Sequence, residues 1–246
     1  MRLEGKRAIV TGGASGFGAG IVRKFAAEGA TVMVADLNGD LAAQVAAEVG
    51  GVAQVVDVSS AASVTAMAEA VSSQWGGVDI IVNNAGVTHL PKPMETVTDE
   101  EFDRVFNVNC KSVYLMARTF NPMMIAAGKG AVLNVASTAG LSPRPNLNWY
   151  NASKGWMITA TKTMAVELAP KGIRVNALCP VAGETPLLAS FMGEDTPEMR
   201  AKFLSTIPIG RFSTPEDMGN AACFLCSDEA GMVTGVAMEV DGGRCI

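Results

Sequence analysis

A phenol and an amine lie four residues apart in the stretch NWYNASKGW, where Tyr150 precedes Lys154 in a chain with only two tyrosines. Residues four apart on a helix are neighbours on one face, so the two side chains can interact. A free tyrosine has a pKa of about 10 and is a poor base at neutral pH, but a close ammonium stabilises its phenolate. The pair therefore fits proton transfer, although the same spacing is common between exposed helix neighbours and needs support from other residues.

A glycine-rich turn, TGGASGFG at residues 11–18, directly follows the first apolar run, RAIV. Gly12, Gly16 and Gly18 permit a tight turn and let the backbone approach a pyrophosphate, with the positive end of the next helix facing the phosphates. The spacing is G-x-x-x-G-x-G rather than G-x-G-x-x-G, and alone it fits an ordinary strand-to-helix connection equally well. Its place between strand and helix favours a dinucleotide, with Ser15 and Phe17 as further contacts.

Asp36 ends the second apolar run, at the interval after the glycines that is typical of a carboxylate binding the adenosine ribose hydroxyls. Together with Asn38 it also precedes a helix, so a capping role is compatible with the first role. A carboxylate repels a ribose 2′-phosphate, and Ser15 supplies no compensating cation. We therefore predict NAD(H) rather than NADP(H), with Leu37 as a neighbouring contact.

Short apolar runs alternate with longer helical segments along the whole chain. The runs are nearly continuous in hydrophobicity, as in a parallel sheet that helices cover on both faces. The expected strands are 7–10, 31–35, 53–56, 79–82, 131–135, 174–178 and 236–240, and the expected helices are 16–28, 39–49, 61–75, 99–127, 150–169 and 215–227. We predict one α/β domain over residues 1–246, a Rossmann-type doubly wound fold with a seven-stranded parallel sheet. An irregular insertion at about 183–213 is typical of a substrate lid.

The composition indicates a globular protein, with 49% apolar and 17% charged residues. A net charge of −5 without a basic patch argues against nucleic acid or an anionic membrane as partner and favours a small molecule. The N-terminus lacks a signal-peptide pattern, and no apolar stretch approaches the roughly 18 residues of a membrane span, so we expect a cytoplasmic protein.

Cys223 and Cys226 form a C-x-x-C pattern in AACFLCSDEA. A structural zinc site needs four ligands, but a second such pair is absent and the only histidine, His89, lies in another segment. We therefore expect both cysteines to pack in the core and predict no metal site.

Taken in order, the motifs resemble those of the classical short-chain dehydrogenase/reductase family over residues 5 to about 243. The matching blocks are TGGASGFG (11–18), DV (57–58), NNAG (83–86), Asn109 in FNVNCKSVY, Ser137 in NVASTAG, YNASK (150–154), RVNALCP (174–180) and VDGG (240–243). Each block lies at the end of an expected strand or the start of a helix, and ligands of open parallel sheets bind beyond the carboxyl ends of the strands.

The resemblance implies a set of cofactor contacts. Asp57 should accept a hydrogen bond from the adenine amino group, and Val58 should supply a backbone contact. Further contacts along the nicotinamide half are Asn84, Ala85 and Gly86 at the ribose, and Pro180, Gly183 and Thr185 at the carboxamide. A tight turn without a ligand is the alternative for the NNAG segment.

By the same resemblance four residues are catalytic. Tyr150 is the general acid or base, and Lys154 lowers its pKa and binds the nicotinamide ribose. Ser137 hydrogen-bonds the substrate oxygen and stabilises the charge that develops on it. Asn109 holds a water that relays protons from Lys154, or bends the helix as a polar residue.

The chain departs from the family after the sixth expected strand, in CPVAGETPL. Val181 stands where glycine is common, and Gly183 stands where a branched residue is common, so the conformation of this loop is open. The expected substrate contacts are mostly apolar: His89, Leu90, Ala139, Arg144, Leu147, Val181, Leu188, Phe191 and Met192. For the Leu-Phe-Met group, packing on the domain is an equal alternative, and Arg144 meets either an anionic substrate group or solvent.

These features predict an NAD-dependent oxidoreductase that interconverts a secondary alcohol and a ketone. The alternatives are a 3-oxoacyl-carrier-protein reductase, a sugar dehydrogenase and a catalytically silent dinucleotide sensor. The carrier-protein reductase usually accompanies NADPH and a basic docking surface, for which Lys129, Lys171 and Arg174 offer only a modest cluster. Apolar helices and an apolar C-terminal stretch indicate self-association, and the resemblance to a family that is commonly tetrameric implies a homotetramer.

Overall fold

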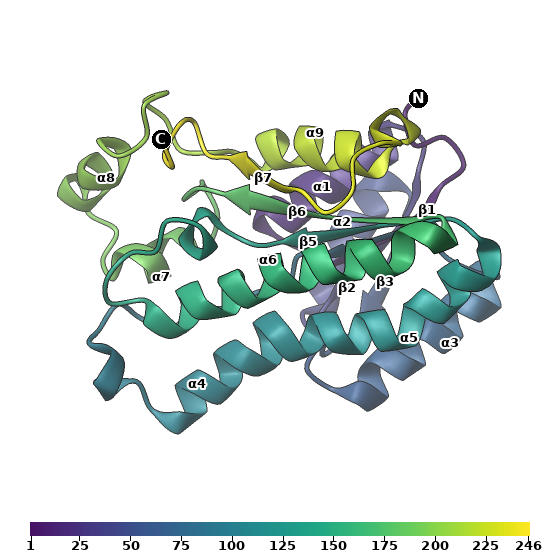
Figure 1. The fold of residues 1–246 in the computed structure, drawn as a ribbon, viewed down its shortest axis with the longest axis horizontal. Helices are drawn as coiled ribbons and strands as arrows, with labels where there is room; N and C mark the ends of the chain where they lie inside the picture. Colours follow the sequence, from purple (N-terminus) through teal and green to yellow (C-terminus); the bar gives the residue numbers. More distant parts are fainter.

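The computed structural model describes residues 1–246 as a seven-stranded parallel sheet with helices on both faces (Figure 1). The strands are β1 (Arg7–Thr11), β2 (Thr31–Asp36), β3 (Val52–Val55), β4 (Ile80–Asn83), β5 (Gly130–Val135), β6 (Ile173–Pro180) and β7 (Ala237–Val240). Their order is β3-β2-β1-β4-β5-β6-β7. The chain runs outward from β1 to β3 and then returns to β4, so the order reverses between β1 and β4, as in a doubly wound fold. The predicted fold class is confirmed.

Two helical layers enclose the sheet. The helices are α1 (Gly16–Ala27), α2 (Gly39–Val49), α3 (Ala61–Trp75), α4 (Asp99–Phe106), α5 (Ser112–Ala127), α6 (Asn148–Leu168), α7 (Leu188–Met192), α8 (Pro197–Leu204) and α9 (Pro215–Cys226). Short 3-10 segments are η1 (Met94–Thr96), η3 (Thr138–Gly140), η4 (Ala169–Lys171) and η5 (Asp228–Ala230). Figure 1 shows α1, α2 and α9 on one face and α3, α5 and α6 on the other.

Local chemistry explains where several helices begin. Thr98 and Glu101 form a capping box at α4, each accepting a backbone N–H at the start of the helix. Thr214 and Asp217 form the same arrangement at α9, and Pro215 occupies the first turn, where its missing N–H costs nothing. Both helices begin at the positions expected from the sequence, 99 and 215.

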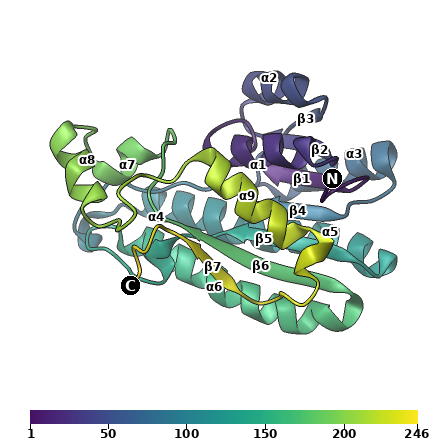
Figure 2. The same cartoon turned by 90° about the horizontal axis from the view of Figure 1, so that it is seen from above.

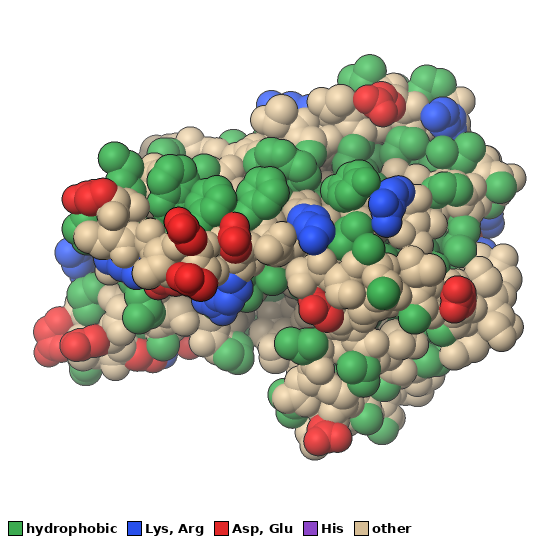
Figure 3. Space-filling model, turned by 90° about the horizontal axis from the view of Figure 1, so that it is seen from below, with side chains coloured by type: hydrophobic (Ala, Val, Ile, Leu, Met, Phe, Trp, Pro, Cys, Tyr) green, Lys and Arg blue, Asp and Glu red, His purple; other side chains and the backbone are tan.

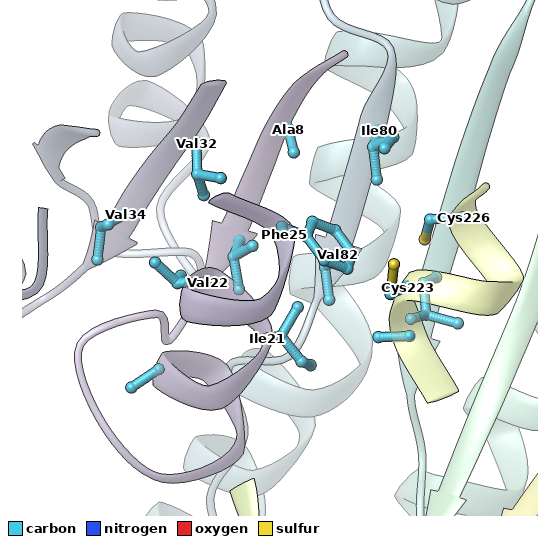
Figure 4. Close-up of a cluster of buried hydrophobic side chains, with 14 of the residues drawn as sticks. Ala8, Ile21, Val22, Phe25, Val32, Val34, Ile80, Val82, Cys223 and Cys226 are labelled. Atoms are coloured by element: carbon cyan, nitrogen blue, oxygen red, sulfur yellow. The ribbon is translucent and has the colours of Figure 1, made fainter. Parts of the chain in front are cut away.

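The core between α1, α9 and the sheet is built from small and β-branched side chains (Figure 4). Phe25 and Val82 are fully buried there, and Cys223 and Cys226 project into the same cluster from α9. The prediction that both cysteines pack in the core is confirmed. The two helices approach closely because Gly20 carries no side chain: a Cβ there would lie 2.2 Å from the carbonyl oxygen of Pro215.

Two segments differ from the expected elements. The stretch 99–127 contains a π-helical turn, Asn107–Lys111, between α4 and α5, where the sequence predicted one continuous helix. The insertion at 183–213 folds into α7 and α8, which lie beyond the carboxyl ends of the strands (Figure 2). Its own apolar cluster, which includes Leu188, Met192 and Phe203, explains why this segment is not an irregular loop.

The face that carries α4, α5 and α6 exposes several large apolar side chains (Figure 3). They include Phe102, Phe106, Tyr114, Trp156 and Val166. None of the helices combines the length and apolar character that crossing a membrane requires.

Candidate active site

A cleft of about 450 Å³ lies beyond the carboxyl ends of the strands. At one end it is lined by the glycine turn and by the ends of β2 and β3, and at the other by Ser137 and Tyr150. The insertion lines the cleft from Gly183 and Thr185, beside the glycine turn, to Phe203 and Ile207. The expected cofactor residues that line it are Gly12, Ser15, Gly16, Phe17, Asp36, Leu37, Asp57, Val58, Asn84, Ala85, Gly86, Pro180, Gly183 and Thr185. Segments far apart in the sequence thus meet in one elongated cleft.

The glycine turn requires glycine at each of its three expected positions. Gly12 and Gly16 have φ of 62° and 51°, a region that other residues rarely adopt. Gly18 does not line the cleft, because it packs beneath the turn, where a Cβ would lie 2.0 Å from the Gly12 carbonyl oxygen. Ser15 precedes α1 but makes no capping hydrogen bond, so its side chain is available to a ligand.

A threonine that the sequence analysis did not single out joins this turn to the NNAG segment. The Thr11 hydroxyl accepts hydrogen bonds from the backbone N–H groups of Asn84 (3.0 Å) and Ala85 (3.2 Å). The Asn84 amide in turn donates to the carbonyls of Thr11 and Gly12. Asn84 therefore holds the two cleft segments together through its side chain. These hydrogen bonds explain the tight turn without a ligand, and the contact of Asn84, Ala85 and Gly86 with the cofactor ribose stays a prediction.

Asp36 lies at the cleft end of β2. Its carboxylate accepts hydrogen bonds from the backbone N–H groups of Ala14 (3.1 Å) and Asn38 (3.0 Å). The cap of α2 is Asn38, whose side chain accepts from the Leu41 N–H, so of the two roles considered for Asp36 the capping role belongs to Asn38. Asp57 lies beyond β3 and accepts from the backbone and hydroxyl of Ser59.

Tyr150 and Lys154 project from the first turns of α6 and are both buried. The Lys154 ammonium lies 5.8 Å from the centre of the Tyr150 ring and donates to the Val135 carbonyl at 2.8 Å, at the end of β5. Ser137, two residues further along, accepts from the Ala139 N–H. The sheet thus brings together three of the four predicted catalytic side chains.

The electrostatics of this group differ from the expectation. Burial raises the pKa of Tyr150 to about 12, although the neighbouring Ser137 hydroxyl and the charge of Arg144 both lower it. Burial also lowers the pKa of Lys154 to about 8. In the protein alone Tyr150 is therefore a neutral phenol at pH 7, and the cation that acts on it most directly is Arg144 rather than Lys154.

Asn109 is fully buried within the π-helical turn and does not line the cleft. Its side-chain oxygen accepts from the Val87 N–H, and its amide donates to the Val87 carbonyl and to the Ser153 hydroxyl, all at 2.9 Å. Asn109 thus ties the segment after β4 to α6, behind Lys154. A π-turn frequently marks a functional position in a helix.

The departure at Val181 and Gly183 has a packing explanation. A Cβ at Gly183 would lie 2.3 Å from the ring of Phe17 and 2.7 Å from the Ser213 hydroxyl. The Phe17 ring occupies the space that a branched side chain would need. Val181 is buried against the insertion and lines the cleft.

The substrate end contains four of the expected contacts, Ala139, Arg144, Val181 and Phe191. The Phe191 ring packs edge-on against Tyr150 with 5.1 Å between ring centres.

The other expected substrate contacts are corrected by the structure, because their side chains lie elsewhere. Leu188 and Met192 face the inside of the insertion, and Leu147 packs beneath Tyr150. His89 is buried away from the cleft with Nδ1 2.8 Å from the Leu90 carbonyl oxygen, and Leu90 is exposed.

Several cleft residues were not expected from the sequence. They are Leu187, Phe203, Thr206 and Ile207 from the insertion and Arg244 from the C-terminal turn. No local motif marks them, since they reach the cleft only when the insertion and the last turn fold over the carboxyl ends of the strands. The arginine beside the VDGG block was the one chemical signal available.

Comparisons with known proteins agree with this arrangement. A sequence model of a family described as enoyl-(acyl carrier protein) reductase matches residues 12–244. 4-Formylbenzenesulfonate dehydrogenase from Comamonas testosteroni is 51% identical, covering 100% of both chains. Galactitol 2-dehydrogenase from Agrobacterium fabrum is 38% identical and covers 99% of each chain. A crystal structure of 3-ketoacyl-(acyl-carrier-protein) reductase from Brucella melitensis complexed with NADH has a TM-score of 0.95 and 50% identity, covering 99% of this chain and 100% of that one.

Proposed function

Because the chain belongs to the short-chain dehydrogenase/reductase family, whose members here are dehydrogenases and reductases, we propose that it is an NAD-dependent enzyme interconverting a secondary alcohol and a ketone. The observation that carries the proposal is the meeting of Ser137, Tyr150 and Lys154 at one end of a cleft whose other end carries the glycine turn and Asp36. A small molecule and a dinucleotide can occupy such a cleft together.

The lining fits NAD at its adenosine end. A Cβ at Gly12 or Gly18 would clash with Asn84, so both glycines let the turn pack tightly against the NNAG segment. A turn of this kind lets its backbone approach a pyrophosphate. Asp36 retains free acceptor capacity on its carboxylate for ribose hydroxyls, and no lysine or arginine lines this end of the cleft to receive a 2′-phosphate. The NADH named in the Brucella melitensis structure supports the same choice.

The chain's own residues account for the proton. In the oxidative direction Tyr150 takes the proton of the substrate hydroxyl, and in the reductive direction its hydroxyl returns that proton to the carbonyl oxygen. Ser137 holds the same oxygen by a hydrogen bond. When bound, the nicotinamide supplies the hydride acceptor or donor and, when oxidised, a positive charge. Lys154 holds its ammonium close to the phenol.

The raised pKa of Tyr150 indicates that its phenolate forms at neutral pH only when a bound ligand stabilises it. Its pKa must fall well below the value of about 12 in the protein alone before the phenolate can act as a base at neutral pH. We propose that substrate and oxidised nicotinamide together provide the remaining stabilisation of the phenolate, with Asn109 fixing the backbone behind Lys154.

The first test is the initial rate of the purified protein with NADH and NADPH in parallel on aryl ketones, cyclic ketones and a 3-oxoacyl thioester, with sugars in the reverse direction. Tyr150→Phe is expected to reduce turnover by at least about 100-fold, the lower range of general acid–base catalysis, while NADH binding by calorimetry stays within about twofold of wild type. Tyr114→Phe, the other tyrosine, is the matched control. Retained turnover in Tyr150→Phe removes Tyr150 from its role.

A 3-oxoacyl-carrier-protein reductase is the second candidate, because the named activity of the Brucella melitensis structure is of that kind. Turnover confined to NADPH and the thioester would favour it. A polyol or sugar is a third candidate substrate, in line with the galactitol 2-dehydrogenase from Agrobacterium fabrum. The relative from Comamonas testosteroni is named for 4-formylbenzenesulfonate, an aromatic carbonyl compound that carries a sulfonate.

We also propose that the insertion with α7 and α8 acts as a lid over the substrate end, and that the protein is a homotetramer. The exposed apolar side chains on α4, α5 and α6 support self-association (Figure 3). Light scattering that returned the mass of a single chain would contradict the tetramer.

A further inference from the structure

Two arginines at the substrate end of the cleft lack any acceptor for their guanidinium groups. Arg144 comes from the segment between β5 and α6, and Arg244 comes from the C-terminal turn; both line the cleft. Neither forms an ion pair or a side-chain hydrogen bond. The other eight arginines do: Arg2, Arg7, Arg23, Arg200 and Arg211 bind carboxylates, Arg104 and Arg174 bind backbone carbonyls, and Arg118 binds the Tyr114 hydroxyl.

Both side chains start from backbone that the protein holds in place. The Arg144 carbonyl accepts a hydrogen bond from the Asn151 amide at 2.7 Å, and its guanidinium lies 4.4 Å above the Phe203 ring of α8. Arg244 belongs to a turn in which the Asp241 carboxylate accepts the N–H groups of Gly243 and Cys245. The Asp241 oxygens are therefore used by backbone and not by Arg244.

The guanidinium charges of Arg144 and Arg244 repel each other, and both side chains are half-buried. Burial lowers the pKa of Arg144, and the charge of Arg244 lowers it further, while Tyr150 is near enough to act on it as well. Cations that are taken from water without a counter-charge raise the free energy of a protein. The only carboxylates that line the cleft, Asp36 and Asp57, lie at its adenosine end.

We propose that Arg144 and Arg244 together bind an oxyanion of the substrate, a carboxylate or a sulfonate, at a part of the molecule remote from the reacting carbon. The guanidinium fork matches such groups with two parallel hydrogen bonds. The rings of Phe191 and Phe203 and the side chain of Ile207 complete the same end and fit an apolar body between the oxyanion and the carbon at Tyr150. The proposal rests on the proposed function, whose substrate class it narrows to anionic alcohols and ketones.

The experiment compares ketones that share one body. 4-Acetylbenzoate and 4-acetylbenzenesulfonate carry the oxyanion, and methyl 4-acetylbenzoate is the neutral counterpart. Wild-type protein with NADH is expected to reduce the anionic ketones with the higher kcat/KM. Arg144→Met and Arg244→Met should each lower the ratio of anionic to neutral kcat/KM by about 10- to 150-fold, the range of a hydrogen bond to a charged group.

Two further variants separate binding from structure. Arg144→Lys keeps the charge but loses the fork, so its ratio should fall between those of wild type and Arg144→Met. Arg200→Met, on α8 and paired with Asp195 outside the cleft, is the matched control and should leave the ratio unchanged. Urea unfolding should show the Arg144→Met/Arg244→Met double variant to be no less stable than wild type, because two repelling charges are removed.

A parallel measurement works without turnover. Calorimetry with 4-acetylbenzoate and with benzenesulfonate should detect binding to wild type and at least a tenfold weaker binding to the double variant. Equal loss of activity on anionic and neutral ketones would overturn the oxyanion site and assign Arg144 to Tyr150 instead. Turnover of all three ketones without preference for the anions would overturn it as well and leave the proposed function standing. Anion binding that depends on both arginines, without turnover, would support the site and count against the function.

Discussion

Asp36→Asn is expected to shift the protein from NADH toward NADPH without adding any new contact. The substitution keeps the size of the side chain. The Ala14 and Asn38 N–H groups bind different oxygens of the Asp36 carboxylate, so the single amide oxygen of asparagine can accept only one of these two hydrogen bonds. It removes one negative charge from the adenosine end of the cleft. The lost backbone hydrogen bond affects both cofactors alike, so the change in the ratio of their affinities measures the lost charge together with its hydrogen bonds to the ribose.

The magnitude follows from two contributions. Hydrogen bonds to a charged acceptor contribute about 1 to 1.5 kcal/mol more than neutral ones, so the affinity for NADH should fall about 5- to 13-fold. Two like charges about 4 Å apart repel by about 1 kcal/mol in water and by about 4 kcal/mol at an effective dielectric constant of about 20. NADPH should thus bind to Asp36→Asn at least about fivefold tighter than to wild type, and the ratio of the two Kd values should change by at least about 25-fold.

The assay is calorimetric binding of each cofactor to purified protein at physiological ionic strength, which needs no substrate. Asp40→Asn is the matched control, since Asp40 is an exposed acid in the first turn of α2 that does not line the cleft. It should leave the ratio within about twofold of wild type, because water and salt screen an exposed charge outside the cleft. Equal changes for both cofactors in Asp36→Asn, or wild-type protein that already binds NADPH as tightly as NADH, would refute the argument.

Two further predictions concern packing and stability. Gly183→Val should destabilise the protein and weaken NADH binding, because its Cβ would meet the Phe17 ring at 2.3 Å. In the double variant Phe17→Ala/Gly183→Val, urea unfolding should show a free energy of unfolding at least about 1 kcal/mol higher than the sum of the two single losses predicts. Strictly additive losses would exclude this contact as the cause. Burial alone would raise the pKa of the Asp79 carboxyl, but hydrogen bonds and charge from Arg7, with Lys129, lower it to about 2. Because the folded pKa is depressed, Asp79→Asn should cost about 2 kcal/mol at pH 7, and the difference from wild type should shrink as pH falls from about 4 to 2; a constant difference would contradict this linkage.

The sequence by itself determined those parts of the cleft that depend on the residues of a single segment. Apolar runs alternating with helical segments specified the parallel sheet. The glycines of the 11–18 turn and the polar residues at strand ends specified the edge of the sheet at which the cleft lies. Such residues act through the backbone conformation of their own segment, so their positions along the chain are sufficient to identify them. The catalytic and cofactor roles assigned to them remain predictions that the experiments above address.

Tertiary structure decided what depends on contacts between distant segments. Leu188, Met192 and Phe203 share one apolar cluster inside the insertion, but only Phe203 also lines the cleft. Hydrophobicity along the chain cannot distinguish these residues. The tertiary structure brought Arg244 next to Arg144, a hundred positions away along the chain. It also showed that burial raises the pKa of Tyr150, because desolvation depends on every element packed around the ring and not on the spacing between Tyr150 and Lys154.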